Sequence, residues 1–283
     1  MCKDFSMKWL LSREIVVILQ SEILNKYSVA LVEQDKLNRL LSQGIPHGAW
    51  FSGWLSRNGW SNQLVKCYCD SGWIERLCRG VVYRKGDTTQ AYPVLASYLK
   101  QGGSDLHIAA HSALELHGYM HFVPMGKPRV MVALHGDYEP EWLRMDAYDR
   151  SFAAVRMNVF RDTADRLVSG ELELLVSSPE QAFAECLLLA PRHYGYMDLF
   201  LLMEQLTVLR PDKVTEVLEK VENQRVRRMY LYMAEKAGHV WLEDVDVKAV
   251  GLTTSPLTVE RGGSFVNKYK MTIPTELYEY EYE

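Results

Sequence analysis

The stretch from Pro46 to Gly86 decides the fold of this chain, and it reads PHGAWFSGWLSRNGWSNQLVKCYCDSGWIERLCRGVVYRKG. Its first part has apolar residues at helical spacing and then Asn58-Gly59, a pair that suits the left-handed conformation of a tight turn. Ser61 is a good N-cap for a second helix, which runs into Ser71-Gly72. Two short strand-like runs follow on either side of Arg79-Gly80. This order predicts a helix-turn-helix followed by a β-wing.

The residue types in this stretch suit contact with DNA. A recognition helix enters the major groove by its N-terminal half, so the short side chains of Ser61, Asn62 and Gln63 would reach base edges. Lys66, one turn later, suits a phosphate or a guanine. The wing would bring four basic residues together along a phosphate backbone: Arg76, Arg79, Arg84 and Lys85. Winged helices also serve as protein–protein modules, and a basic hairpin is often a solvated edge, but the agreement of charge and amide-rich helix face favours DNA.

Length and charge indicate a small basic unit joined to a larger acidic one. The chain has 283 residues and a formal net charge of −4, with 48% hydrophobic and 24% charged residues, as in a folded globular protein. Residues 26–87 contain nine Lys and Arg against five Asp and Glu, whereas residues 88–283 contain 20 against 28. A basic head of +4 on a body of −8 is typical of a DNA-binding module whose second domain has another task.

The five cysteines, at positions 2, 67, 69, 78 and 186, are odd in number and lack the spacing of a disulfide framework. They predict a reducing, cytoplasmic location. Cys67 and Cys69 have one residue between them and no second pair, which fits neither a zinc knuckle nor a redox motif. The apolar segment of residues 9–24 is interrupted by charges, so it predicts neither a signal peptide nor a membrane span.

Three units are predicted along the chain. Residues 1–27 form an accessory helix, residues 28–90 the winged helix-turn-helix, and residues 91–283 a larger mixed domain, which makes the fold class α+β. Within the winged helix, residues 29–41 predict its first helix, which ends at Gly44-Ile45-Pro46. A short helix over residues 92–99 and a flexible stretch at Gln101-Gly102-Gly103 connect the two larger units.

The larger domain mixes helical and strand periods. A helix is expected over residues 107–118, capped by Ser104 or Asp105, and strands over residues 129–134, 155–160 and 172–176. Ser178-Pro179-Glu180-Gln181 reads as a capping box with proline at the first helical position. Helices are expected over residues 196–209, 211–221 and 225–237. Strands at 257–260 and 265–273 would then form a closing hairpin around Arg261-Gly262-Gly263.

An enzyme is the alternative class, and it rests on two weak patterns. His107, His111 and Glu115 would fall on one helix face and could bind a metal, with His117 and His121 close behind. Pro211-Asp212 and Asp246-Val247-Lys248 supply the letters of a nuclease motif, although the proline stands at an expected helix start. Histidines on a half-buried helix are usually packing residues, and the chain has no phosphate-binding glycine motif. We therefore expect no enzyme, no metal and no cofactor, with a metal-dependent nucleic-acid enzyme as the alternative.

Four phrases of the sequence carry a resemblance to a known family: SGWIERLCRGVVYRKG, SSPEQAFAECLLLAP, GHVWLEDVDV and GGSFVNKYKMTIPTEL. They resemble the AbiEi antitoxins, the regulator half of the AbiE abortive-infection toxin–antitoxin systems, over about residues 28–277. The resemblance implies a phage-defence autorepressor whose winged helix binds double-stranded operator DNA with inverted repeats. It also implies that the C-terminal domain counteracts a neighbouring nucleotidyltransferase toxin, with direct contact left open.

Overall fold

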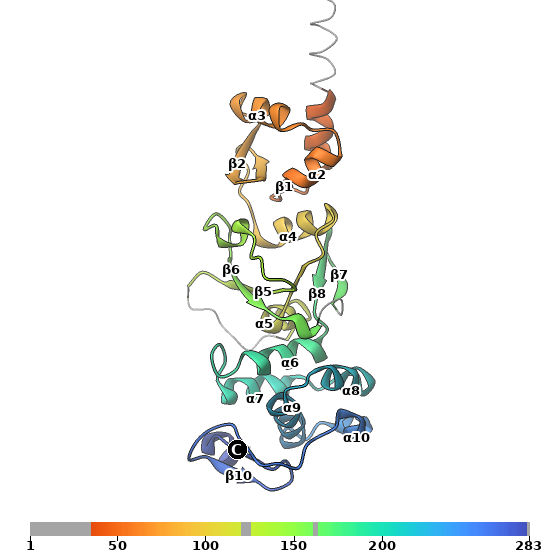
Figure 1. Ribbon diagram of the computed structural model, residues 1–283, viewed down its shortest axis with the longest axis vertical. Helices are drawn as coiled ribbons and strands as arrows, with labels where there is room; N and C mark the ends of the chain where they lie inside the picture. Colours follow the sequence, from red (N-terminus) through yellow and green to blue (C-terminus); the bar gives the residue numbers. More distant parts are fainter. Residues whose placement is uncertain (1–34, 120–125, 161–163, 282–283) are drawn as a thin grey trace, which may run out of the picture.

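The computed structural model describes residues 35–119, 126–160 and 164–281, and the predicted accessory helix of residues 1–27 lies outside them. The described chain is elongated and has three parts stacked along its long axis (Figure 1). A small helical head with a narrow sheet forms one end, a five-stranded sheet the middle, and helices with a second small sheet the other end. The α+β fold class is confirmed.

The head has the predicted winged helix-turn-helix. Residues 35–43 are helical and are followed by β1 (Trp50–Phe51), α2 (Ser52–Arg57), α3 (Asn62–Asp70), β2 (Ile74–Cys78) and β3 (Val81–Arg84). The strands form an antiparallel sheet in the order β1-β3-β2. Leu40, Leu55, Trp60 and Ile74 fill the core between helices and sheet, and each is almost fully buried. The apolar periodicity of the sequence therefore corresponds to one compact core.

α4 (Ala91–Lys100) was expected to be a connecting helix, but it packs into the core of the body. The Gln101 side chain accepts a hydrogen bond from Phe51 N at 2.8 Å and donates one to Ala49 O at 2.7 Å. The predicted flexible stretch at 101–103 therefore holds the head to the body through β1, because a single amide side chain satisfies two backbone groups of the head.

The middle of the molecule is a five-stranded sheet in the order β6-β5-β4-β8-β7. Its strands are β4 (Leu106–Ile108), β5 (Arg129–Leu134), β6 (Ser151–Arg156), β7 (Asp165–Ser169) and β8 (Leu172–Val176). The β5–β6 and β4–β8 pairs are parallel, and the other two pairs are antiparallel. α4 contacts β8 on one side of the sheet, and α5 (Ala110–Leu116) contacts β5 and α6 (Pro179–Leu189) on the other (Figure 1).

Two predicted elements of this sheet were wrong. The helix expected over residues 107–118 begins only at Ala110, because residues 106–108 pair with β5 and β8 as a strand. The strand expected over residues 155–160 lies earlier, at 151–156, and residues 158–160 form the 3-10 helix η2 (Asn158–Phe160). The strands expected at 129–134 and 172–176 are confirmed as β5 and β8.

Helices form most of the remaining chain. They are α6 (Pro179–Leu189), α7 (Tyr196–Gln205), α8 (Pro211–Lys220), α9 (Gln224–Lys236), α10 (Val247–Val250) and α11 (Thr275–Glu279), with the 3-10 helices η1 (Glu141–Arg144) and η3 (Val240–Asp244). Ser178 caps α6 as predicted, since its hydroxyl accepts a hydrogen bond from Gln181 N at 3.3 Å.

The predicted closing hairpin was wrong in its pairing. β9 (Leu257–Thr258) lies parallel to β11 (Met271–Ile273), and β10 (Ser264–Val266) is the antiparallel partner of β11. The strand expected over residues 265–273 is therefore two strands, separated by a turn in which Lys270 has a φ of +50°. Arg261-Gly262-Gly263 connects two strands that do not pair with each other.

Candidate nucleic-acid interface

α3 presents a polar face to solvent at the end of the head. The hydroxyl of Ser61 accepts a hydrogen bond from Leu64 N at 3.2 Å and so caps the helix as predicted. Gly59, with a φ of +89°, makes the tight turn between α2 and α3. Val65 and Tyr68 point into the head core, so the opposite face is free. The exposed residues of this α3 face are Asn62, Gln63, Lys66, Cys67 and Asp70.

Two of the predicted basic residues lie beside the C-terminal end of α3. Arg84 pairs with Ile74 at the start of the β2–β3 hairpin, and Lys85 N donates to Trp73 O at 3.1 Å. A methyl group on Gly72 would lie only 3.2 Å from Lys85 Nζ, so the lysine side chain crosses the backbone that ends α3. Trp73 is 53% exposed at the same place. Arg84, Lys85 and Trp73 thus form an exposed basic and aromatic group next to α3.

The other two basic residues are placed differently, so the hairpin does not bring all four together. Arg76 lies opposite Val82, in the middle of the β2–β3 pair. Arg79 lies in the turn, five residues after Ile74 and beyond the far end of β2, a strand about 13 Å long. Cys78 and Val81 flank that turn and pack into the core of the body. The turn of the hairpin therefore faces the body, whereas its open end lies beside α3.

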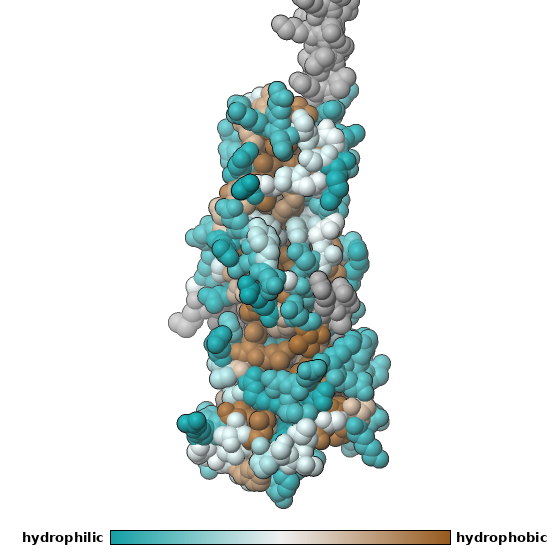
Figure 2. All heavy atoms as spheres, viewed as in Figure 1, coloured by the Kyte–Doolittle hydropathy of each residue, from teal (hydrophilic) through white to brown (hydrophobic). Residues whose placement is uncertain are grey.

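This arrangement can serve two kinds of DNA contact. Amide and hydroxyl groups on an exposed helix can bond to base edges, and the exposed cations Arg84 and Lys85 beside it can bond to phosphates, although Lys85 also lies 3.9 Å from the Glu75 carboxylate. The space-filling view shows hydrophilic residues covering much of the head on the face drawn (Figure 2). Sequence reasoning did not include Trp73 or Cys67 among the candidates. The signal for Trp73 was its place directly after a helix-ending glycine, where the chain turns outward.

The metal ligands considered for the alternative enzyme do not share a helix face. His107 is on β4, and its Nδ1 lies 2.8 Å from His135 Nε2 while its Nε2 lies 3.0 Å from Glu185 Oε1. His111 contacts the Tyr194 hydroxyl at 2.6 Å, and Glu115 forms an ion pair with Arg150 at 3.1 Å. Burial lowers the pKa of His111.

These side chains hold the sheet to the helices. Glu185 is fully buried and accepts hydrogen bonds from Ser177 Oγ, Gln181 Nε2 and Ala110 N, each at 2.8 Å. These donors satisfy the hydrogen-bonding capacity of the buried Glu185 carboxylate. The metal-site interpretation of His107, His111 and Glu115 was therefore wrong in its geometry. Across residues 35–119, 126–160 and 164–281, no cluster of three or more His, Cys, Asp or Glu is placed to hold a metal ion.

The residues of the nuclease pattern also have structural roles at the starts of helices. Pro211 is at the first position of α8. Asp246 caps α10, because its Oδ1 accepts hydrogen bonds from Lys248 N at 3.0 Å and Ala249 N at 3.1 Å. Asp212 and Asp246 both stand at the start of a helix and neither follows a strand, as the nuclease alternative would require.

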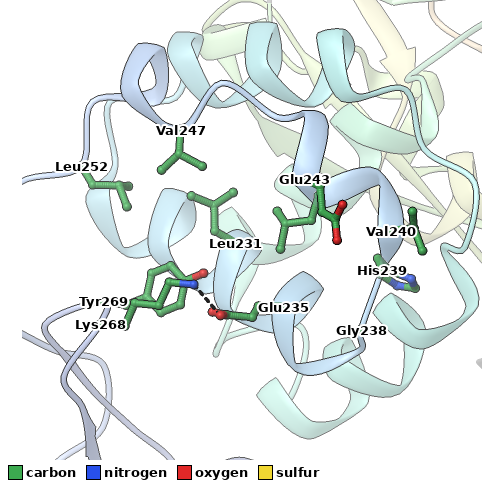
Figure 3. Close-up of a pocket in the computed structure, with 11 residues that line it drawn as sticks. Leu231, Glu235, Gly238, His239, Val240, Glu243, Val247, Leu252, Lys268 and Tyr269 are labelled. Carbon is green, nitrogen blue, oxygen red and sulfur yellow. Dashed lines mark hydrogen bonds and ion pairs between the residues drawn. The ribbon is translucent and has the colours of Figure 1, made fainter.

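A cavity of about 580 Å³ lies at the other end of the molecule, between α9, η3 and the segment before β11 (Figure 3). Leucine side chains form its floor, and the Glu235 carboxylate at one side is held by the Lys268 ammonium. His239 also lines it, but its Nε2 lies 2.7 Å from Met203 O. The Glu235–Lys268 pair therefore holds the C-terminal segment to α9, and His239 is bonded to α7.

None of the helices in the described parts of the chain is long and apolar enough to cross a bilayer. Two family profiles match the sequence. Residues 33–125 match the N-terminal domain of the AbiEi antitoxin transcriptional regulators, and residues 129–274 match the AbiEi antitoxin transcriptional regulators of type IV toxin–antitoxin systems. The chain belongs to the AbiEi family.

A solved structure supports the fold of this AbiEi protein. The crystal structure of the RV2827C protein from Mycobacterium tuberculosis resembles it with a TM-score of 0.52 at 16% sequence identity. The match covers 79% of this chain and 85% of that one. No curated protein matches the sequence. The family membership makes the protein an antitoxin and a transcriptional regulator, which implies DNA and a toxin as partners.

Proposed function

We propose that this AbiEi protein represses its own operon by binding inverted repeats in the promoter, and that it counteracts a nucleotidyltransferase toxin encoded beside it. The observation that carries the DNA-binding part is the exposed polar face of α3 with Arg84 and Lys85 next to it. The toxin chemistry and the inverted repeats follow from the resemblance to AbiE systems. Since its target is operator DNA, we infer that the protein works in the cytoplasm.

The proposed contacts divide into base readers and phosphate binders. The base readers are Ser61, Asn62 and Gln63; because the Ser61 oxygen already caps α3, this side chain would only donate its proton. The phosphate binders are Lys66, Arg84 and Lys85. Arg76, in the middle of the β2–β3 pair, would be a further phosphate contact. Arg79 would be the weakest contact, because it lies at the body end of the hairpin.

We also propose that residues 28–90 carry DNA binding and residues 91–283 carry protection from the toxin. The division is supported by the charges of the two parts of the chain, +4 for residues 26–87 and −8 for residues 88–283. Ala49, Cys78 and Val81 pack into the core of the body, so the two units share apolar contact although their tasks differ.

We infer that the protein acts without catalysis. The support is that the histidines and carboxylates first considered as ligands are bonded within the fold, as at His107 and Glu185. A metal-dependent nucleic-acid enzyme remains the alternative. It requires stoichiometric metal in the purified protein together with hydrolysis or transfer on nucleic acid, and finding both would favour it over our proposal.

The test combines promoter binding with toxin rescue. The full chain should bind DNA from its own promoter more tightly than shuffled DNA of equal length. Asn62→Ala or Gln63→Ala should cost about 1–3 kcal/mol at particular base pairs only. When the neighbouring toxin is co-expressed, these two variants should still restore growth. Equal affinity of the wild-type protein for promoter and shuffled DNA would refute the autorepressor, and growth arrest in the presence of wild-type protein would refute the antitoxin assignment.

A further inference from the structure

Another cavity, of about 350 Å³, lies where the head meets α4 (Figure 1). Residues 43–45, β1 and α2 form its head side, and Ser97, Lys100 and Gln101 at the end of α4 form its body side. Its volume is at the lower end of the range for small-molecule sites, which often lie at the interface between two structural units. The cavity therefore has the size and the location of a site for a small ligand.

Two tryptophan side chains of the head line this cavity. Trp54 is half-buried and stacks on Trp60, with ring centroids 5.4 Å apart, so the plane of its indole is fixed. Trp50 is buried, and a methyl group on Gly44 would lie 3.1 Å from Cε2 and 2.5 Å from Cζ2 of its ring. The edge of the Trp50 indole next to Nε1 therefore faces Gly44, which itself lines the cavity. Two indole rings in one lining favour a flat aromatic ligand.

Trp50 Nε1 is a buried donor for which the described chain provides no acceptor. A buried N–H without an acceptor is unfavourable, because it has lost its bond to water and gained none in return. The polar side chains on the body side are already bonded: Ser97 Oγ donates to Pro93 O at 2.7 Å, and the Gln101 amide bonds to two backbone groups of the head. A ligand that accepts from Trp50 Nε1 would therefore gain a hydrogen bond without breaking one.

Three cations surround the cavity, and no Asp or Glu is among its lining residues. Each donates to the backbone oxygen of a lining residue: Lys100 Nζ to Gln43 at 3.2 Å, Arg57 Nη2 to Gln101 at 3.1 Å and Arg39 Nη2 to Asn58 at 3.2 Å. Within the described chain, none of the three forms an ion pair with a carboxylate. Three helices end beside the cavity, and each end contributes at most about −0.5 charge. The three cations therefore leave an excess of about +1.5, which favours an anion.

We propose that this cavity binds a small aromatic carboxylate, whose carboxylate accepts hydrogen bonds from Trp50 Nε1 and Lys100 Nζ and whose ring lies against Trp54. Such a ligand would contact the head and α4 together, and so would change the affinity of the protein for its operator. Only this regulatory use rests on the proposed function, because ligand binding is measured without DNA. A chain that binds its promoter but no ligand would refute the ligand site alone, and a chain that binds the ligand but not its promoter would refute the proposed function alone.

The first test compares three probes that share one ring and differ in charge. The full wild-type chain is titrated by calorimetry with indole-3-acetate, indole-3-acetamide and tryptamine. Indole-3-acetate should bind one molecule per chain with a dissociation constant below about 1 mM. The neutral amide should bind about tenfold more weakly, since a hydrogen bond to a charged group is stronger than a neutral one, and the cation tryptamine should bind most weakly. A wild-type chain that does not bind indole-3-acetate, or binds tryptamine equally well, would overturn the proposal.

The second test locates the ligand with matched variants. Lys100→Gln should weaken binding of indole-3-acetate about tenfold and leave the amide nearly unchanged, whereas Lys248→Gln on α10 should change neither. Trp50→Phe keeps a ring but removes the donor and should weaken both probes, and Trp73→Phe, at an exposed tryptophan outside the cavity, should not. Lys100 is exposed, so its variant remains decisive if Trp50→Phe does not fold. Unchanged binding of indole-3-acetate by Lys100→Gln, or an equal loss in Lys248→Gln, would place the ligand elsewhere and overturn the proposal.

Discussion

Replacing Arg84 and Lys85 together by glutamine gives the sharpest test of how the head meets DNA. Both lie at the open end of the β2–β3 hairpin beside α3, and neither side chain supports the head core. Each lost phosphate contact lowers the slope of log affinity against log salt by about 0.9, so the pair should lower it by about 1.8. Between about 50 and about 200 mM salt, the wild-type protein should then lose about twelvefold more affinity than the variant.

The assay is fluorescence anisotropy with labelled promoter DNA at four or more salt concentrations. Arg79→Gln is the internal comparison, because Arg79 carries the same charge at the body end of the same hairpin, and its slope should change by clearly less than about 0.9. Lys248→Gln, at the far end of the molecule, should change nothing. An unchanged slope for the Arg84 and Lys85 double variant, with a reduced slope for Arg79→Gln, would show that the hairpin turn and not its open end faces DNA.

Three further outcomes follow from contacts elsewhere. Gln101→Ala should destabilise the head against urea by about 2 kcal/mol, since it leaves two backbone groups near β1 without their partner; a single unchanged unfolding transition would contradict this. For Glu180, burial raises the pKa, but the hydrogen bonds from Arg210 outweigh it and the net shift is downward. Arg210→Ala should therefore cost about 2 kcal/mol at pH 7, and the difference from wild type should shrink as the pH falls below about 4, because protonation of Glu180 removes the charge that Arg210 stabilises. Cys67 should react with a maleimide in the free protein and be protected by promoter DNA, whereas equal reaction rates with and without DNA would place α3 away from the interface.

The head could be predicted from sequence because its signals are local. Ser61 caps α3 within three residues, Asn58-Gly59 turns the chain within two, and Arg79-Gly80 closes the hairpin within two. Such features depend on backbone preferences of the residues themselves. The different surroundings of Arg79 and Arg84 could not be predicted, since they depend on how the hairpin packs against α3 and the body.

The body was harder because its strands are specified by distant partners. β4 has only three residues, and its apolar sequence fits a helix as well as a strand until β5 and β8 are placed on either side. β7 has four exposed residues and so lacks the alternation that marks a half-buried strand. β9 pairs in parallel with β11 across a connection that sequence spacing alone does not reveal.

The histidines show the same limit for a site. His107 and His111 are four apart, which would place them on one face of a helix, but the chain changes from strand to helix between them. Their partners, Glu185 and Tyr194, are more than 70 residues away in the sequence. A spacing argument can find ligands only when the secondary structure between them is known, and here the buried carboxylate of Glu185 determines what His107 does.

The contact between the head and the body affects which half-site spacings the protein can bind. Gln101 fixes β1 to the end of α4, and α4 is packed against β8, the neighbour of β7. The path from α3 to the body therefore runs through packed elements and hydrogen bonds instead of a free linker. If the bodies of two copies meet on an inverted-repeat operator, the head–body contact determines how far apart their α3 helices lie. Half-sites must then lie at one spacing on the same face of the duplex, because each additional base pair both moves and rotates the second site. A head on a flexible linker would accept several spacings, so the head–body contact limits the operators that the protein recognises.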